Sequence, residues 1–152
     1  MIAVLTLICV WIGLAGIHES GHLLCALILR LKIQAFGYQM SPMPSFFVSI
    51  KRSEIKWKNV SFLFAGNLAT LLLFIVMNLT DLLNSPYLII AFTLQFIVEY
   101  NPFYSDITII ISKAYNDGSL RKIHNSYYKT YKFASTLACW ILFVCVLIFL
   151  NF

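Results

Sequence analysis

Four long apolar runs constrain the fold of this sequence more than any other feature. They cover residues 3–29, 60–79, 87–111 and 133–150. A helix that crosses a hydrocarbon core of about 30 Å needs roughly 20 apolar residues, and each run approaches or exceeds that length. Because 61% of the residues are hydrophobic and 11% are charged, the composition differs strongly from that of soluble globular domains. We therefore predict an all-α, multi-pass integral membrane protein with about four transmembrane helices.

The sequence predicts a single membrane-embedded domain over residues 1–152. No linker-like or low-complexity stretch separates the apolar runs. We expect the core to comprise residues 3–111, and the last run, 133–150, to add a C-terminal transmembrane helix. The first run is longer than the apolar centre of a secretory signal peptide, so we expect it to remain in the mature protein.

The connection between the first two runs predicts a short β-hairpin. Residues 36–40 and 46–50 contain aromatic and β-branched side chains, which favour strands. The sequence between them, Ser41-Pro42-Met43-Pro44, is typical of a turn. We expect this hairpin to lie at the membrane interface or to dip into it.

The basic residues, which give a formal net charge of +5, gather in two of the three connections. They are Arg30, Lys32, Lys51, Arg52, Lys56 and Lys58 in the first, and Lys113, Arg121, Lys122, Lys129 and Lys132 in the third. Because cytoplasmic connections are enriched in Lys and Arg, we expect both connections and the active site to face the cytoplasm. The charge therefore indicates orientation in a lipid bilayer, with no nucleic-acid partner, and we expect a bacterial cell membrane as the location.

The segment His18-Glu19-Ser20-Gly21-His22 carries the predicted chemistry inside the first run. The i, i+4 spacing places both imidazoles on one helical face, where they can bind one zinc ion. Glu19 stands beside them, as a general base for hydrolysis requires. A carboxylate in mid-membrane costs about 2.5–3.5 kcal/mol, which argues against a chance match. We predict His18 and His22 as metal ligands and Glu19 as the catalytic base.

A catalytic zinc site has three protein ligands, so a third ligand must come from another part of the chain. Asp106 in the third run follows Pro102, which removes a helical hydrogen bond and should kink or unwind the helix. Such a break can turn Asp106 toward a polar cavity. Glu99 lies on roughly the same helical face and competes for this role, but we favour Asp106 as the third ligand.

Two asparagines are candidates for substrate binding. Asn67 lies among small residues in the second run, and Asn101 precedes the proline of the third run. Either amide could donate a hydrogen bond to the substrate carbonyl or to the oxyanion that forms from it. Asn67 could equally serve to hydrogen-bond a neighbouring helix, and the sequence does not choose between these roles.

These residues resemble the site-2 protease family of intramembrane zinc metalloproteases. That family carries a His-Glu-x-x-His motif on one core helix and an Asn-Pro motif with a ligand Asp on another, which here correspond to residues 18–22 and to Asn101-Pro102 with Asp106. The resemblance spans residues 13–111, including Ala65-Gly66 and the hairpin. It implies zinc ligation by His18, His22 and Asp106, catalysis by Glu19, and a hairpin that pairs with an extended substrate strand.

The predicted function is hydrolysis of a peptide bond in or near a transmembrane segment of a small membrane protein or membrane-bound peptide. One alternative is a catalytically inactive membrane protein, with a structural or vestigial metal site, that acts as an immunity or accessory factor. Another is a different membrane zinc hydrolase that acts on a short peptide, a leader segment or a lipid-linked group. A closed fourth ligand such as Glu99 would favour the inactive protein, and a defined cleavage product would favour an enzyme.

Overall fold

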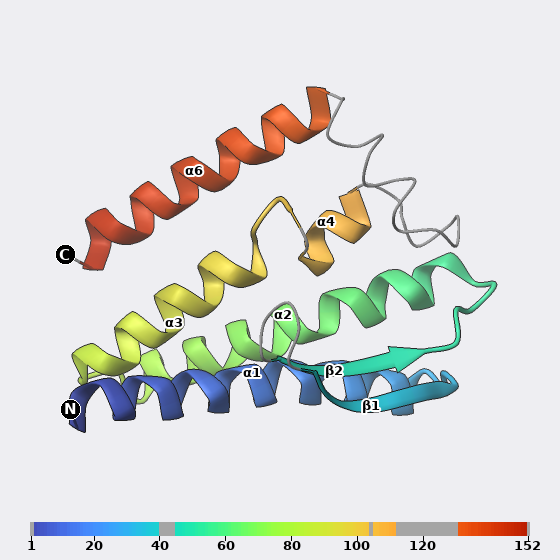
Figure 1. Cartoon of the computed structure of the whole chain (residues 1–152), viewed down its shortest axis with the longest axis horizontal. Helices are drawn as coiled ribbons and strands as arrows, with labels where there is room; N and C mark the ends of the chain where they lie inside the picture. Colours follow the sequence, from blue (N-terminus) through green and yellow to red (C-terminus); the bar gives the residue numbers. More distant parts are fainter. Residues whose placement is uncertain (1, 40–44, 104, 112–130, 152) are drawn as a thin grey trace. The chain divides into compact units, whose positions relative to one another are not determined.

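The computed structural model of the chain describes residues 2–39, 45–103, 105–111 and 131–151. It is mostly helical, with one small antiparallel sheet (Figure 1). The elements are α1 (Ile2–Ile28), β1 (Ile33–Gln39), β2 (Ser45–Ile50), α2 (Lys56–Leu79), α3 (Pro86–Glu99), α4 (Asp106–Ile111) and α6 (Tyr131–Asn151). They form two compact units, Met1–Gln95 and Phe96–Phe152.

In the first unit, α1 and α2 lie side by side and run in opposite directions (Figure 1). Gly21 of α1 sits directly against α2: a Cβ atom at this position would lie 2.5 Å from the backbone oxygen of Ala65 and 2.7 Å from the Cβ of Ala69. Small residues on both sides therefore let the two backbones approach closely, as they do in helix pairs within membranes.

Two residues after the end of α1, and likewise of α2, a charged residue adopts the left-handed conformation. Arg30 has φ 52° and Asp81 has φ 54°. After each, a leucine amide bonds back to a carbonyl of the last turn, from Leu31 to Ala26 at 2.8 Å and from Leu82 to Met77 at 2.9 Å. This bonding pattern satisfies carbonyls that a helix end leaves without a partner.

The predicted hairpin is confirmed. β1 and β2 pair antiparallel, from Ile33 opposite Ile50 to Gln39 opposite Ser45, with one irregularity between Ile33 and Ala35. β2 packs against α1 (Figure 1), so the strands lie next to the helix that carries the His-Glu-His segment. The predicted turn at residues 41–44 lies outside the described residues.

The second helix begins earlier in the chain than the apolar run that predicted it, at Lys56 instead of residue 60. Hydropathy indicates which residues suit a membrane core, and it does not register polar turns that extend a helix beyond that core. Lys58 in this extra turn donates a hydrogen bond to the carbonyl of Leu29 at 3.1 Å. Asn59 exchanges two hydrogen bonds with the backbone of Ser53, at 2.8 and 2.9 Å, and so fixes the entry into α2.

Two helices in the described part of the chain are long and apolar enough to cross a membrane, Leu5–Ile28 within α1 and Lys56–Leu79. In the most apolar 18-residue stretch of each helix, 17% and 22% of the residues are buried, which is low for core helices of a soluble protein. The segments Pro86–Glu99 and Phe133–Val146 are apolar but shorter.

Burial in this structure is inverted relative to a soluble domain. Large apolar side chains such as Leu24, Leu27, Leu72 and Leu79 are more than half exposed. The buried polar side chains among the described residues are His22, Asn59, Asn67, Thr70, Thr93, Gln95, Glu99, Asn101, Ser105 and Thr108, and the buried apolar ones are Leu14, Ala26, Phe62, Ala91, Phe92 and Phe96. In water the reverse distribution is the norm, so this surface suits an apolar environment.

The third apolar run is interrupted, as its proline predicts. α3 ends at Glu99 and α4 begins at Asp106, with Pro102 in the segment between them. α6 covers the fourth run. Most of the third connection, residues 112–130, lies outside the described residues. Its basic residues from Lys113 to Lys129, on which the predicted orientation partly rests, lie there too.

Candidate metal centre

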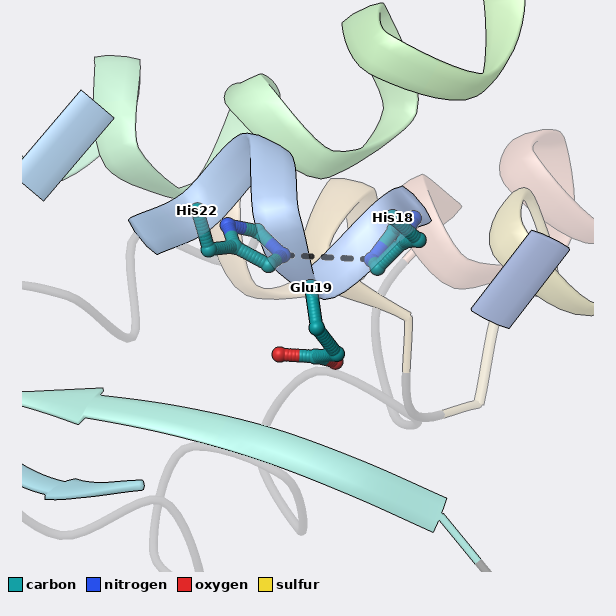
Figure 2. Close-up of side chains that lie close together, drawn as sticks. All are labelled: His18, Glu19 and His22. Carbon is teal, nitrogen blue, oxygen red and sulfur yellow. Dashed lines mark hydrogen bonds between the residues drawn. The ribbon is translucent and has the colours of Figure 1, made fainter. Parts of the chain in front are cut away.

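The two histidines of the first helix converge on one point. Figure 2 shows the imidazoles of His18 and His22 facing each other across one turn of α1, joined by a hydrogen bond between their Nε2 atoms, which lie 3.1 Å apart. The rings are nearly perpendicular, with centroids 4.8 Å apart. Two nitrogen ligands of a tetrahedral zinc ion are about 3.3 Å apart at the usual bond lengths. The observed pair is therefore close to the spacing that a shared ion requires.

A backbone carbonyl of α2 orients the His22 ring. His22 Nδ1 lies 2.6 Å from the oxygen of Phe62, and His22 is 4% exposed. Since a carbonyl oxygen only accepts hydrogen bonds, Nδ1 must carry the proton, which leaves the Nε2 of the neutral ring with a lone pair. Metal-binding histidines typically have this arrangement, in which the other ring nitrogen donates to a carbonyl or carboxylate.

Gly66 of α2 closes the other side of the imidazole pair. A Cβ atom at Gly66 would lie 2.5 Å from the Nε2 atoms of both His18 and His22, and 2.7 Å from the Cε1 of His18. The space next to both nitrogen atoms therefore exists because residue 66 has no side chain. The donor set, two imidazoles beside a carboxylate, is one that zinc prefers.

The carboxylate of Glu19 completes the group. One potential ligand atom from each of His18, Glu19 and His22 lies within 4.8 Å of the others. Figure 2 shows the Glu19 carboxylate pointing away from α1, toward the side where the strands run. The three residues could hold a metal ion, and this spacing equally lets Glu19 exchange protons with a molecule held beside the imidazoles.

Asp106, the predicted third ligand, is the first residue of α4 in the second unit. Ser105 caps this helix, because its Oγ accepts a hydrogen bond from the amide of Thr108 at 3.2 Å. An acidic residue in the first turn is also favourable for the helix dipole. The cap therefore stabilises the start of α4 at Asp106. The role of Asp106 as a ligand stays a prediction.

The amide of Asn101 bridges the helix break. Its Nδ2 donates to the carbonyl of Val98, and its Oδ1 accepts a hydrogen bond from the amide of Phe103 at 2.9 Å. The backbone oxygen of Asn101 accepts from the hydroxyls of Ser105 and Thr108, at 2.6 and 2.9 Å. Polar side chains thus pair with backbone groups that an unbroken helix would satisfy itself. This is a structural role, and the predicted substrate-binding role of Asn101 stays untested.

Asn67 and Glu99 are both buried. Asn67 follows Gly66 in α2, and its backbone oxygen accepts a hydrogen bond from the hydroxyl of Thr70 at 3.1 Å. Glu99 is the last residue of α3. The substrate-binding role of Asn67 and the competing ligand role of Glu99 both remain predictions.

Sequence reasoning missed the contribution of Phe62 to this site. The group that orients His22 is a backbone carbonyl, which every residue possesses, so no sequence pattern could single out Phe62. Gly66 gave a partial signal, because it stands in a run of small residues that favours close helix contact. Its position opposite both histidines follows from how α1 and α2 are aligned, which local patterns do not encode.

Comparison with known proteins gives no relative for this chain. No protein family matches it, and no curated protein or solved structure shows a significant match. The functional argument therefore rests on the residues of the chain themselves.

Proposed function

We propose that this protein is an intramembrane zinc metalloprotease that hydrolyses a peptide bond in or near a transmembrane segment of a small membrane protein or peptide. The observation that supports this most directly is the pair of converging Nε2 atoms of His18 and His22, 3.1 Å apart, with a carboxylate oxygen of Glu19 within 4.8 Å of a ring nitrogen of each histidine. In the described part of the chain, these three side chains form a group that could hold a metal ion.

In this proposal His18, His22 and Asp106 hold the ion. Bound zinc would supply a Lewis acid that polarises the scissile carbonyl and makes a water molecule more acidic. The Phe62 carbonyl keeps the Nδ1 proton of His22 in place, so that Nε2 remains available as a ligand. The ligand helix is held by its close contact with α2 at Gly21, which limits movement of both imidazoles.

Glu19 acts as the proton-transfer group. Its carboxylate accepts a proton from the attacking water and then donates it to the nitrogen of the departing amine as the peptide bond breaks. Because Glu19 points toward the side of α1 where the strands run (Figure 2), we infer that the substrate enters there. A substrate helix must unwind locally, since its carbonyl reaches the site only in an extended segment, and β1 or β2 offers strand pairing for such a segment.

The membrane arrangement belongs to the same proposal. We place four spans in the bilayer, with the first and third connections on the cytoplasmic side. The inverted burial of α1 and α2 and their exposed leucines support a lipid environment. A reporter fused after Phe152 should then be active on the side opposite the cytoplasm, and a cytoplasmic signal would contradict the topology.

The test of catalysis compares wild-type protein with Glu19→Gln on membrane peptides that contain a helix-breaking residue, with products identified by mass spectrometry. We expect wild-type cleavage at one defined bond, and a rate at least about 100-fold lower for Glu19→Gln because proton transfer is lost. Glu54→Gln, which changes an exposed acid in the same unit, should cleave normally. Full proteolysis by Glu19→Gln would refute the proposed role of this residue.

A further inference from the structure

The position of Gly66 opposite the two histidines is more restrictive than ordinary helix packing. A Cβ atom at residue 66 would lie 2.5 Å from each of the two Nε2 atoms. These are the same two atoms that approach each other to 3.1 Å. Any side chain at residue 66 would thus occupy the place where both nitrogen atoms converge.

Gly21, on the facing helix, provides a contrast. A Cβ atom at Gly21 would meet the backbone oxygen of Ala65 at 2.5 Å and the Cβ of Ala69 at 2.7 Å. Those atoms can move only if α2 itself moves. The atoms opposite Gly66 are the ends of two side chains, which rotate about their χ angles. A methyl group at residue 66 should therefore displace imidazoles, whereas one at residue 21 should push the helices apart.

The His22 ring has little freedom to avoid such a methyl group. Its Nδ1 is bonded to the Phe62 carbonyl at 2.6 Å, one helical turn before Gly66. The His22 ring also lies beside the Phe62 ring, with centroids 4.9 Å apart. Rotation of His22 would break the hydrogen bond, and otherwise His18 must turn away. In both cases the two Nε2 atoms separate.

We propose that Gly66 is a positioning residue of the metal centre: its missing side chain leaves the space in which the Nε2 atoms of His18 and His22 meet at one ion. This inference rests on the proposed function, because the two Nε2 atoms must converge only if they bind the same ion. It predicts that a larger residue at position 66 weakens metal binding and leaves the helix pair folded.

The first test measures zinc in detergent-purified wild type and Gly66→Ala by elemental mass spectrometry, together with the visible absorption spectrum of the Co²⁺-loaded proteins. We expect zinc affinity to fall roughly 10- to 100-fold in Gly66→Ala, as when groups that orient metal ligands are changed, and the Co²⁺ bands to weaken or shift. Circular dichroism should show unchanged helix content. Gly13→Ala and Gly16→Ala are matched controls, because a Cβ atom at either position meets nothing within 4 Å.

The outcomes separate the two proposals. If wild type and both controls fail to bind zinc, the proposed function is wrong. If they bind zinc and Gly66→Ala binds it equally well with the same Co²⁺ spectrum, the inference about Gly66 is wrong. Loss of zinc in Gly66→Ala alone, with the fold retained, supports both.

A second test needs no metal and remains informative if Gly66→Ala is too unstable to purify well. Thermal unfolding of metal-free protein is measured for Gly66→Ala in the wild-type background and in a His18→Ala/His22→Ala background, as a mutant cycle. Without the imidazoles, the methyl group meets neither Nε2 atom, and alanine favours a helix more than glycine does. Gly66→Ala should lower the melting temperature relative to wild type. In the double-alanine background it should leave the melting temperature equal to that of its parent or raise it. Equal losses in both backgrounds would overturn the inference.

Discussion

The Nδ1 atom of His22 lies 2.6 Å from the backbone oxygen of Phe62. This contact connects the helix that carries the potential ligands to the helix that packs against it. It also selects the tautomer in which the Nε2 of His22 has a lone pair directed toward His18. The candidate metal centre thus depends on both α1 and α2 and not on the His-Glu-His segment alone.

The first prediction follows from the chemical nature of that contact. Phe62→Leu keeps the backbone carbonyl and loses only the aromatic ring, so zinc content should stay within about twofold of wild type. His22→Ala should remove zinc, because the ligand itself is absent. Elemental analysis of both purified variants checks this. Zinc loss in Phe62→Leu would show that the ring, and not the carbonyl, orients His22.

The second prediction concerns helix packing. Gly21→Ala places a methyl group against the backbone oxygen of Ala65 and the Cβ of Ala69, and overpacking of this kind costs about 1–3 kcal/mol. Unfolding in detergent, followed by circular dichroism, should show this loss relative to wild type. In Gly13→Ala the added Cβ atom meets nothing within 4 Å, so this variant should keep the stability of wild type. An unchanged melting temperature for Gly21→Ala would mean that α1 and α2 are farther apart than described.

The third prediction tests the helix break. Asn101→Ala removes the hydrogen bonds to Val98 and Phe103. Each contributes about 0.5–1.5 kcal/mol to stability, so the free energy of unfolding should fall by roughly 1–3 kcal/mol. Asn84→Ala also removes one side-chain bond, to Asp81, but at an exposed site where changes usually stay within about 0.5 kcal/mol. Comparative thermal unfolding measures both. If Asn101→Ala keeps full stability yet loses cleavage, its amide serves the substrate instead.

The fourth prediction concerns α6. The indole Nε1 of Trp140 donates to the carbonyl of Ile97 at 3.1 Å, a carbonyl near the end of α3 that the adjacent break leaves available. Trp140→Phe leaves this oxygen without the indole donor and should cost about 1–3 kcal/mol. Trp11→Phe, which changes a 37% exposed side chain, should have little effect. Equal melting temperatures for the two variants would argue against α6 as a support for the break.

The sequence predicts the elements of this fold better than their mutual alignment. The lengths of α1 and α6, the hairpin and the break at Pro102 follow from hydropathy, strand propensity and the missing proline amide, all of which are local. The polar first turn of α2 was missed because Lys56 is too hydrophilic to count as part of an apolar run.

The same distinction applies to the candidate site. His18, Glu19 and His22 are found from their spacing within one helix. The roles of Phe62, Gly66 and Trp140 depend on which residue of one helix faces which residue of another. Helices in lipid pack through small residues and individual hydrogen bonds, which leave a weak trace in the pattern of apolar residues.

The most direct test of the central claim is the zinc content of the detergent-purified protein, measured by elemental mass spectrometry for wild type, His18→Ala, His22→Ala and Asp106→Ala. Asp81→Asn, which changes an exposed acid at a helix end, is the control for Asp106→Ala. The account predicts about one zinc ion per chain in wild type and the control, and loss in the three ligand variants. Wild-type protein that holds no zinc even when supplied with it would contradict the proposed metalloprotease.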